Sequence, residues 1–410
     1  MRPRYAFGQA GGGRQTQRKG LEVKIFRTLP TGRLLALLAV AGAALVVGVA
    51  IAVGARASGP TPPAEPLAQA VHDALAAPAP AGITARVSFT NNLLPSGALT
   101  GQAGSALITG ASGRLWSTND GRGRIELQSD AGDVQIVWNQ NLVTVYDASS
   151  NTAYRLTLPS QTSSSTTTTA PTPPTLDEIT QAITDTSTYW ALGDAVPTNL
   201  AGQPAYDVSV SPKTSAGLLG AVELAWDAEN GVPLKLAISA RGDSTPVLEL
   251  GVTDISFGAV ASSDVDVSPP AGATIVDVPT SGGNGGQSTT DVTGLSAVQA
   301  ALPFQVAAPD TLGSLGRSEV RLVGSGDHQG ALIVYGEGPG AVALFEHATD
   351  TQSGSSPLDT LPQVSIGGAT GHELTTPLGT VVSWQRGGVS FVLAGSVTAA
   401  TAEADAAAVQ

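Results

Sequence analysis

The chain has 410 residues, of which 42% are hydrophobic and only 13% are charged, and its formal net charge is −13. A chain of this length exceeds one ordinary domain and predicts two or three folded units. It contains no cysteine, which excludes disulfide bonds, a thiolate nucleophile and a lipidated N-terminal cysteine.

The charge is divided unevenly along the chain. The first 33 residues carry eight lysines or arginines against Glu22, a charge of +7, so the remaining residues carry −20. An acidic body of this kind argues against nucleic acid as a partner. Leu34–Ala55 follows as 22 residues without a charge, which as a helix would span about 33 Å and cross a bilayer.

We therefore expect a single-pass protein of the cell membrane, with residues 1–33 as a basic cytoplasmic arm and an extracytoplasmic body. The alternative is a secreted protein, because Ala55-Arg56-Ala57 fits a signal-peptide cleavage site near Ala57. The apolar run exceeds the 7–15 residues typical of a signal peptide, which favours a retained transmembrane helix over residues 34–55.

Stretches of low complexity divide the body. Residues 56–66 form a Pro-rich spacer, residues 160–174 a Ser/Thr/Pro insertion predicted to be disordered, and residues 280–290 a Gly/Ser linker. These boundaries leave folded units at residues 67–279 and 291–410. The insertion need not split the first unit, because added loop length costs little entropy.

Periodicity predicts the elements of the first unit. Apolar residues at helical spacing predict helices over Leu67–Leu75 and Leu176–Thr184. Alternation of apolar and polar residues predicts strands at 83–89, 106–109, 114–118, 124–128, 134–139, 143–146, 154–158, 205–211, 222–227, 233–241 and 247–257. Turn-forming residues separate these strands, which is typical of an antiparallel sheet. Its apolar face must be covered by the helices.

The second unit follows the same pattern. Short strands are predicted at residues 331–335, 341–346, 371–375, 381–386 and 389–394, and a closing Ala-rich helix at residues 398–409.

Signatures of catalysis and metal binding are missing from the sequence. Metal-ligand spacing is absent from the four histidines, His72, His328, His347 and His372. The sequence has no G-x-S-x-G nucleophile elbow, and no P-loop lysine follows its Gly-rich turns. We expect no enzyme, no catalytic residues, no metal and no cofactor.

Two segments of the first unit carry a family resemblance. The segment Trp226–Val278 contains an acidic turn with Gly and Pro, two long strands, and a closing PPAGA at residues 269–273. Trp138 and the VYD step at residues 145–147 lie in consecutive predicted hairpins. The order of helix, meander, helix and meander resembles the LolA-like lipoprotein-carrier superfamily, which includes the RseB/MucB regulators. In the second unit, YGEGPGAVALFEH and GGVSFVLAGSV with a closing helix resemble the small C-terminal domain of RseB-like proteins.

The resemblance implies an α+β fold: a half-open antiparallel β-barrel covered by helices, then a small C-terminal α+β domain. Both follow the N-terminal transmembrane helix that the apolar run at residues 34–55 predicts. It also implies an apolar cavity for a lipid or lipoprotein acyl chain. The candidate lining residues are Val87, Phe89, Ile125, Leu127, Ile136, Trp138, Val143, Val145, Leu236 and Ile238.

Two questions stay open at this point. The same ten residues could fill a core instead of lining a cavity, and the ring of Trp138 could either plug the sheet or wall a pocket. The alternative function is an RseB-like regulator of envelope stress that contacts an anti-sigma factor or another membrane protein.

Overall fold

The computed structural model describes residues 59–94, 106–139, 141–158, 173–214, 217–278, 292–324, 329–349, 358 and 361–409. The expected cytoplasmic arm, transmembrane helix and Gly/Ser linker, and most of the Ser/Thr/Pro insertion, lie outside these residues. Within the described ranges, none of the helices has the length and hydrophobicity that crossing a bilayer requires.

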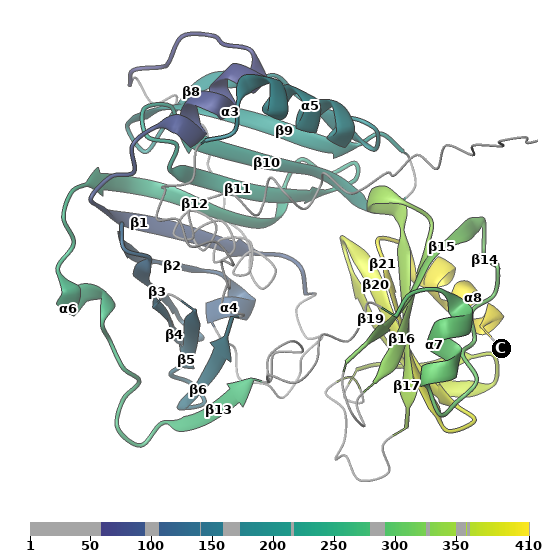
Figure 1. Ribbon diagram of the computed structural model, residues 1–410. Helices are drawn as coiled ribbons and strands as arrows, with labels where there is room; N and C mark the ends of the chain where they lie inside the picture. The colour runs from purple at the N-terminus through teal and green to yellow at the C-terminus, as the bar shows by residue number, and fades with distance from the viewer. Residues whose placement is uncertain are drawn as a thin grey trace, which may run out of the picture.

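Thirteen strands form a first sheet that curls into a half-barrel (Figure 1). They are β1 (Gly82–Asn91), β2 (Ala111–Thr118), β3 (Arg122–Ser129), β4 (Gly132–Asn139), β5 (Leu142–Asp147), β6 (Thr152–Thr157), β7 (Trp190–Leu192), β8 (Val196–Leu200), β9 (Gln203–Pro212), β10 (Leu219–Asp227), β11 (Pro233–Ala240), β12 (Pro246–Phe257) and β13 (Thr274–Val278). The order across the sheet is β13-β6-β5-β4-β3-β2-β1-β12-β11-β10-β9-β7, and β8 also pairs with β9. Among the described strands, β13 differs from the others because it pairs with β6 in parallel.

The alternation expected from the sequence divides this sheet into two faces. In β3, Ile125 and Leu127 are buried. Arg124 and Glu126, which alternate with them along the strand, point to the opposite side of the sheet. We call the face that carries Ile125 and Leu127 the inner face, because it is the concave side of the half-barrel, and the other the outer face. This arrangement confirms the expected sheet with one apolar face.

Two helices lie side by side over β9 and β10 (Figure 1): α3 (Leu67–Ala76) and α5 (Leu176–Thr186). Ala70 of α3 is buried against Tyr206 and Trp226. A capping box starts α5, in which Thr175 Oγ1 accepts from the Glu178 amide and the Glu178 carboxylate accepts from the Thr175 amide at 2.8 Å. Both helices were expected from the spacing of their apolar residues.

The strand expected at residues 106–109 is wrong. These residues form a short helix, α4 (Ala106–Thr109), which ends at Gly110 in a left-handed conformation with φ of 84°. A short run of three apolar residues and a threonine fits either structure, and here the tertiary contacts decide. Ala106 is fully buried and packs on the inner face over β1, β3 and β4.

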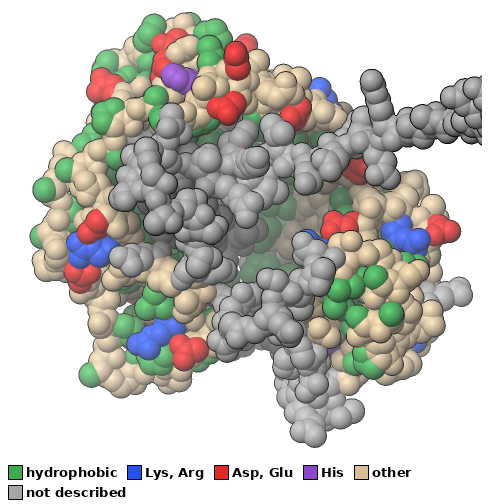
Figure 2. Space-filling model, in the orientation of Figure 1, with side chains coloured by type: hydrophobic (Ala, Val, Ile, Leu, Met, Phe, Trp, Pro, Cys, Tyr) green, Lys and Arg blue, Asp and Glu red, His purple; other side chains and the backbone are tan. Residues whose placement is uncertain are grey.

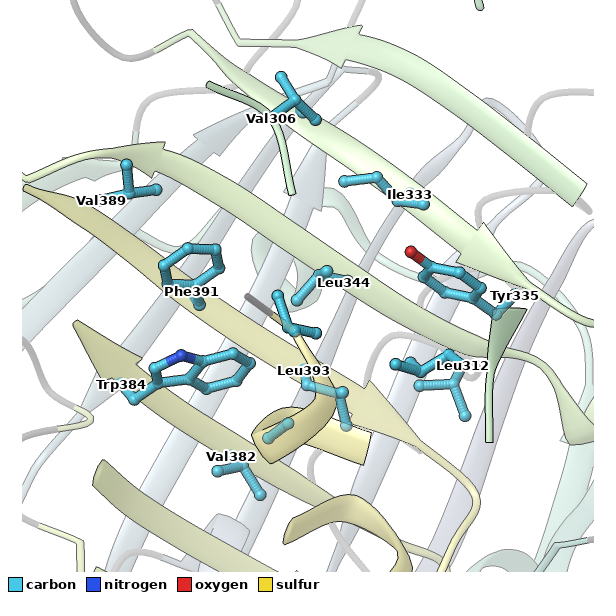
Figure 3. Packing of buried hydrophobic residues seen from close by; sticks show 14 of the residues in the cluster. Val306, Leu312, Ile333, Tyr335, Leu344, Val382, Trp384, Val389, Phe391 and Leu393 are labelled. Carbon is cyan, nitrogen blue, oxygen red and sulfur yellow. The ribbon is translucent and has the colours of Figure 1, made fainter. Parts of the chain in front are cut away.

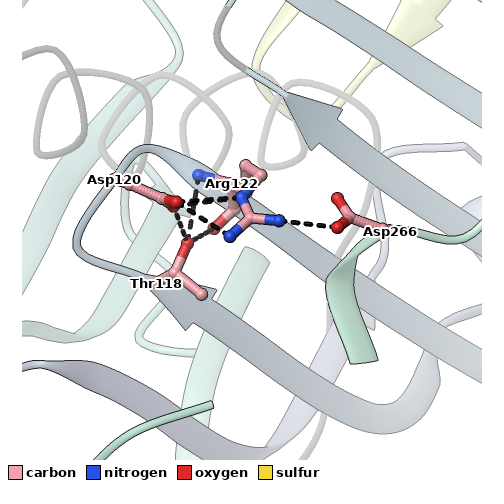
Figure 4. Close-up of polar contacts among 4 residues, drawn as sticks. All are labelled: Thr118, Asp120, Arg122 and Asp266. Atoms are coloured by element: carbon pink, nitrogen blue, oxygen red, sulfur yellow. Dashed lines mark hydrogen bonds and ion pairs between the residues drawn. The ribbon is translucent and has the colours of Figure 1, made fainter. Parts of the chain in front are cut away.

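The chain between β12 and β13 crosses the outer face, and we call residues 258–273 the strap. It contains α6 (Ser262–Val265), which contacts β2 and β3. Arg122 Nη1 donates to Asp266 Oδ2 at 2.6 Å (Figure 4). Arg124 Nη1 donates to the carbonyl oxygen of Asp264 at 3.1 Å. The strap therefore returns the chain to the far edge of the sheet, where β13 pairs with β6.

The arginine that holds the strap is itself fixed by the turn before it. Arg122 also donates to Asp120, and Thr118 Oγ1 donates to the same carboxylate (Figure 4). The hydrogen bonds from Arg122 and then from Thr118 lower the pKa of Asp120 to about 2, so it stays ionised near neutral pH. Asp120 and Asp266 thus hold the Arg122 guanidinium between them.

Replacing Asp266 with Asn should loosen the strap without unfolding the sheet. The variant removes the charge that Arg122 Nη1 contacts at 2.6 Å, whereas the Asp120 contact stays. We expect faster amide exchange in residues 259–273 and little change in β3, measured by hydrogen-exchange mass spectrometry. Asp254→Asn, at the 3.9 Å contact with Arg86 elsewhere on the outer face, is the control. Equal exchange in the wild type and Asp266→Asn would contradict the assignment.

The second sheet has eight strands (Figure 1). They are β14 (Thr311–Leu312), β15 (Leu315–Val323), β16 (Gly330–Tyr335), β17 (Val342–Ala348), β18 (Gln363–Ile366), β19 (Ala369–Thr376), β20 (Gly379–Arg386) and β21 (Val389–Gly395), in the order β14-β15-β16-β17-β21-β20-β19-β18. The helices of this part are α7 (Leu295–Ala301), η2 (Gly338–Gly340) and α8 (Ala399–Ala408). All five strands and the closing helix that were expected are present, to within a few residues.

One hydrophobic core lies between this sheet and its helices (Figure 3). Ile333 and Leu393 are fully buried, and Trp384 stacks on Phe391 with ring centroids 5.1 Å apart. α7 supplies Val298 to the same cluster, and α8 supplies Ala402 and Ala406.

Within the described residues, hydrogen bonds join the parts that contain the two sheets at two places. The amides of Leu218 and Leu219, before and in β10, both donate to Ser396 Oγ at 3.0 Å. The Tyr189 hydroxyl donates to the carboxylate of Glu337. The two sheets are therefore joined by a few polar contacts as well as by the chain itself.

Candidate apolar binding surface

The inner face is continuous across the first sheet. The strand register places one row of side chains directly opposite each other from β1 to β9: Phe89, Leu250, Leu236, Leu224 and Val208. A second row on the same face consists of Leu248, Ile238, Val222 and Val210. Because side chains opposite each other in a sheet share a face, the apolar surface passes from the half under α4 to the half under α3.

The structure brings eight of the ten predicted lining residues together. Six of them are buried in one cluster with Ala106 of α4: Val87, Phe89, Ile125, Leu127, Ile136 and Trp138. Val143 and Val145 are partly buried and pack against this cluster. Leu236 and Ile238 lie on the same face in β11 and are half-buried, outside this cluster. The part of the inner face under α4 is therefore packed, and the side chains of this face become more exposed with distance from α4.

Trp138 lies against the backbone of the neighbouring strand. Its partner across the sheet is Gly123, and a Cβ atom at Gly123 would come within 2.0 Å of Cζ2 of the indole ring. The ring is 3% exposed. A residue without a side chain at position 123 thus makes room for the indole ring on the sheet. Trp138 belongs to the floor of the inner face.

Two rows of apolar side chains lead from this floor to the edge of the sheet. One row consists of Trp138, Val143, Leu156 and Val278, and the other of Ile136, Val145, Tyr154 and Val276. We call the six residues beyond β4 the open rim: Val143, Val145, Tyr154, Leu156, Val276 and Val278. The exposed fraction is 3% at Trp138 and 39% at Val278 in the first row, and 8% at Ile136, 42% at Tyr154 and 38% at Val276 in the second row.

The open rim was only partly predictable. Tyr154 and Leu156 belong to an expected strand, but the alternation of apolar and polar residues does not distinguish exposed apolar side chains from those of a filled core. Val276 and Val278 were missed because β13 pairs with a strand more than a hundred residues earlier in the chain. The alternating stretch Thr274–Val278 was the available signal. Figure 2 shows hydrophobic side chains at the floor of a hollow between the two sheets.

Charged groups of the β9–β12 half lie on the outer face. Lys235 Nζ donates to Asp207 Oδ2 at 2.9 Å and to Glu223 Oε2 at 2.8 Å. Burial disfavours the charged form of Lys235, but these hydrogen bonds outweigh it and raise its pKa. Burial raises the pKa of the neighbouring Glu249, and Lys235 opposes that rise. The two rim rows contain no charged side chain, which suits an uncharged hydrocarbon.

Within the described residues, a polar cavity lies away from the inner face. No group of three or more His, Asp or Glu in them is placed to hold a metal ion. A cavity of about 330 Å³ lies beside the Pro-rich spacer, where the Tyr206 hydroxyl donates to the carbonyl oxygen of Pro63 at 2.7 Å. Its lining includes the carboxylates of Glu65, Asp73 and Glu229, so it differs in character from the inner face.

No protein-family model matches this sequence, and no curated protein matches it either. Three solved structures similar to the chain are of MucB. MucB in complex with MucA(peri) is 15% identical, with 79% of this chain and 91% of that chain covered and a TM-score of 0.39. The Pseudomonas aeruginosa MucA/MucB complex is 16% identical, with coverage of 83% and 94% and a TM-score of 0.39. MucB alone is 14% identical, with coverage of 83% and 96% and a TM-score of 0.37.

These neighbours are of the RseB/MucB group that the sequence motifs resemble. With TM-scores below 0.5, the likeness does not by itself establish a ligand or a partner for this chain.

Proposed function

We propose that this chain is a membrane-anchored, extracytoplasmic, non-enzymatic protein that holds a lipid or a lipoprotein acyl chain on the inner face of its first sheet. The observation that carries the proposal is the open rim. Its six apolar side chains continue a buried hydrophobic cluster without a charged residue, yet they are left partly exposed. An exposed apolar strip continuous with a core is the kind of surface that an apolar ligand covers.

The open rim is large enough to contribute substantially to the free energy of ligand binding. Covering each 100 Å² of apolar surface contributes about 2.5 kcal/mol before the cost of immobilising the ligand is subtracted. An acyl chain that lies along both rim rows would cover a few times that area. The expected affinity is therefore set by apolar area, and polar groups of the ligand would lie at the edge of β13.

Introducing a charge on the rim should abolish ligand retention. Val276→Asp puts a carboxylate in the row with Tyr154, where a hydrocarbon chain would have to desolvate it. We expect native mass spectrometry of residues 59–410, purified without added lipid, to detect bound lipid in the wild type and at least tenfold less in Val276→Asp.

The matched control is Leu142→Asp, because Leu142 is equally exposed at 38% but lies on the outer face of β5. It should retain lipid like the wild type. Loss of lipid from both variants to the same extent, or a lipid-free wild type, would contradict the proposal.

The second candidate is a regulator that acts through contact with an anti-sigma factor or another membrane protein. Two of the similar structures are complexes of MucB with MucA, and this chain has a second sheet joined to the first by few polar contacts. Affinity capture of the anchored chain from its native membranes tests this function, and recovery of no membrane protein would count against it. Both functions can coexist if the ligand binds one arrangement of the protein better than another.

A further inference from the structure

The core of the second sheet contains a carboxylate. Glu346 of β17 is 0% exposed, and it follows Val342 and Leu344 on the strand face that packs into the hydrophobic core. Its partners across the sheet are Ala331 of β16 and Phe391 of β21. A carboxylate in such surroundings is costly to ionise unless a cation or several hydrogen-bond donors surround it.

Glu346 has one hydrogen-bond donor within the described residues. The Ala307 amide donates to Oε2 at 2.9 Å, and Oε1 has no partner there. Ala307 belongs to residues 302–310, which join α7 to β14 without regular secondary structure. Gln299 holds the same segment from the other side, because its Oε1 accepts from the Val306 amide at 2.8 Å. Two side chains therefore fix neighbouring amides of one irregular segment.

The other groups around Glu346 do not neutralise it. β16 contributes the buried Tyr335, whose hydroxyl also lacks a partner among the described residues, and β21 contributes the uncharged Phe391. The guanidinium of Arg317 on β15 donates to Asp310 at 2.9 Å and to the carbonyl oxygens before it. α7 contributes an amide side chain and no charge.

These surroundings favour the protonated acid. Burial raises the pKa of Glu346 to about 7, and the hydrogen bond from Ala307 offsets part of that rise. Near neutral pH, a change of one pH unit therefore changes the ratio of ionised to protonated Glu346 about tenfold.

We propose that Glu346 is a proton-controlled latch that holds residues 302–310 against the core of the second sheet. The neutral acid tolerates burial and keeps the segment in place. When the acid ionises, water reaches the carboxylate most easily by local opening of this irregular segment, because loops open at lower free energy than the central strands β16, β17 and β21. Docking of residues 302–310 thus responds to the pH around the protein.

Hydrogen exchange of the full chain tests the latch. Amide exchange of residues 302–310 is measured by mass spectrometry at pH 5 and pH 7 and corrected for the intrinsic pH dependence of exchange. In the wild type we expect the opening constant of the segment to increase at least about tenfold between these pH values. In Glu346→Gln, which keeps the shape of the side chain without its titration, we expect no increase.

Glu319→Gln is the matched control, since Glu319 lies on the neighbouring strand β15 with 47% of its side chain exposed. It should show the pH dependence of the wild type. The proposal is overturned if the wild-type opening constant is the same at pH 5 and pH 7. It is also overturned if Glu346→Gln keeps the increase.

Discussion

Replacing Trp138 with Ala is expected to destabilise the first sheet by about 3–5 kcal/mol, the range measured when a buried aromatic side chain is truncated in a core. Trp138 is 3% exposed and its ring lies over Gly123, so the variant leaves a void in a packed cluster. Chemical denaturation followed by circular dichroism measures the loss. Trp138 also begins a row that leads to the open rim, so the void should let the surface take a bulkier apolar ligand.

Trp116→Ala provides the comparison. Trp116 lies on β2 on the outer face, where it is half-buried beneath the guanidinium of Arg124 with a ring-to-guanidinium distance of 4.9 Å. Its truncation should cost clearly less free energy and leave lipid retention unchanged. Equal losses of stability for the two tryptophans would mean that Trp138 is not part of a packed floor.

The second large effect is a loss of stability as the pH rises, caused by Glu346. Its pKa is about 7 in the folded protein against a reference value of 4.5, so the folded state binds more protons between these values. The stabilisation is fully present below about pH 4.5 and is lost as the pH rises through about 7, which amounts to about 3 kcal/mol. Urea denaturation of the second sheet at pH 5 and pH 8 measures it.

Glu346→Gln should remove this pH dependence, because the amide stays neutral at both pH values. The difference in unfolding free energy between the wild type and the variant isolates Glu346 from other groups that titrate, such as Asp405, whose pKa burial also raises. The wild type and the variant are compared by the difference in their unfolding free energies at each pH. If that difference were the same at pH 8 and at pH 5, Glu346 would be hydrated in the folded protein.

The alternation of apolar and polar residues predicted most strands of the first sheet, because the two strands of each hairpin are close together in the sequence. The alternation in β3 to β6 and the turns between them specify strand, face and register together. The same reasoning failed at α4, where four residues fit a helix as well as a strand. It could not find β13, because its pairing with β6 depends on the strap and not on a local turn.

The candidate site shows a similar limit. The ten residues chosen from alternation do lie on one face, but periodicity cannot say which part of a face a helix covers. That depends on where α4 and α3 pack, so the open rim emerged only from the structure. Glu346 was missed because acidic residues in strands usually face water. Its position after Val342 and Leu344 in an alternating strand was the signal that placed it inside.

The central claim is that an apolar ligand occupies the inner face beside β6 and β13. Photo-crosslinking in native membranes tests it most directly, with benzoyl-phenylalanine placed either at Tyr154 on the open rim or at Leu142 on the outer face. The two positions are exposed to a similar extent, at 42% and 38%. We predict lipid adducts from position 154 and not from position 142; equal adducts from both positions, or none from position 154, would contradict the claim.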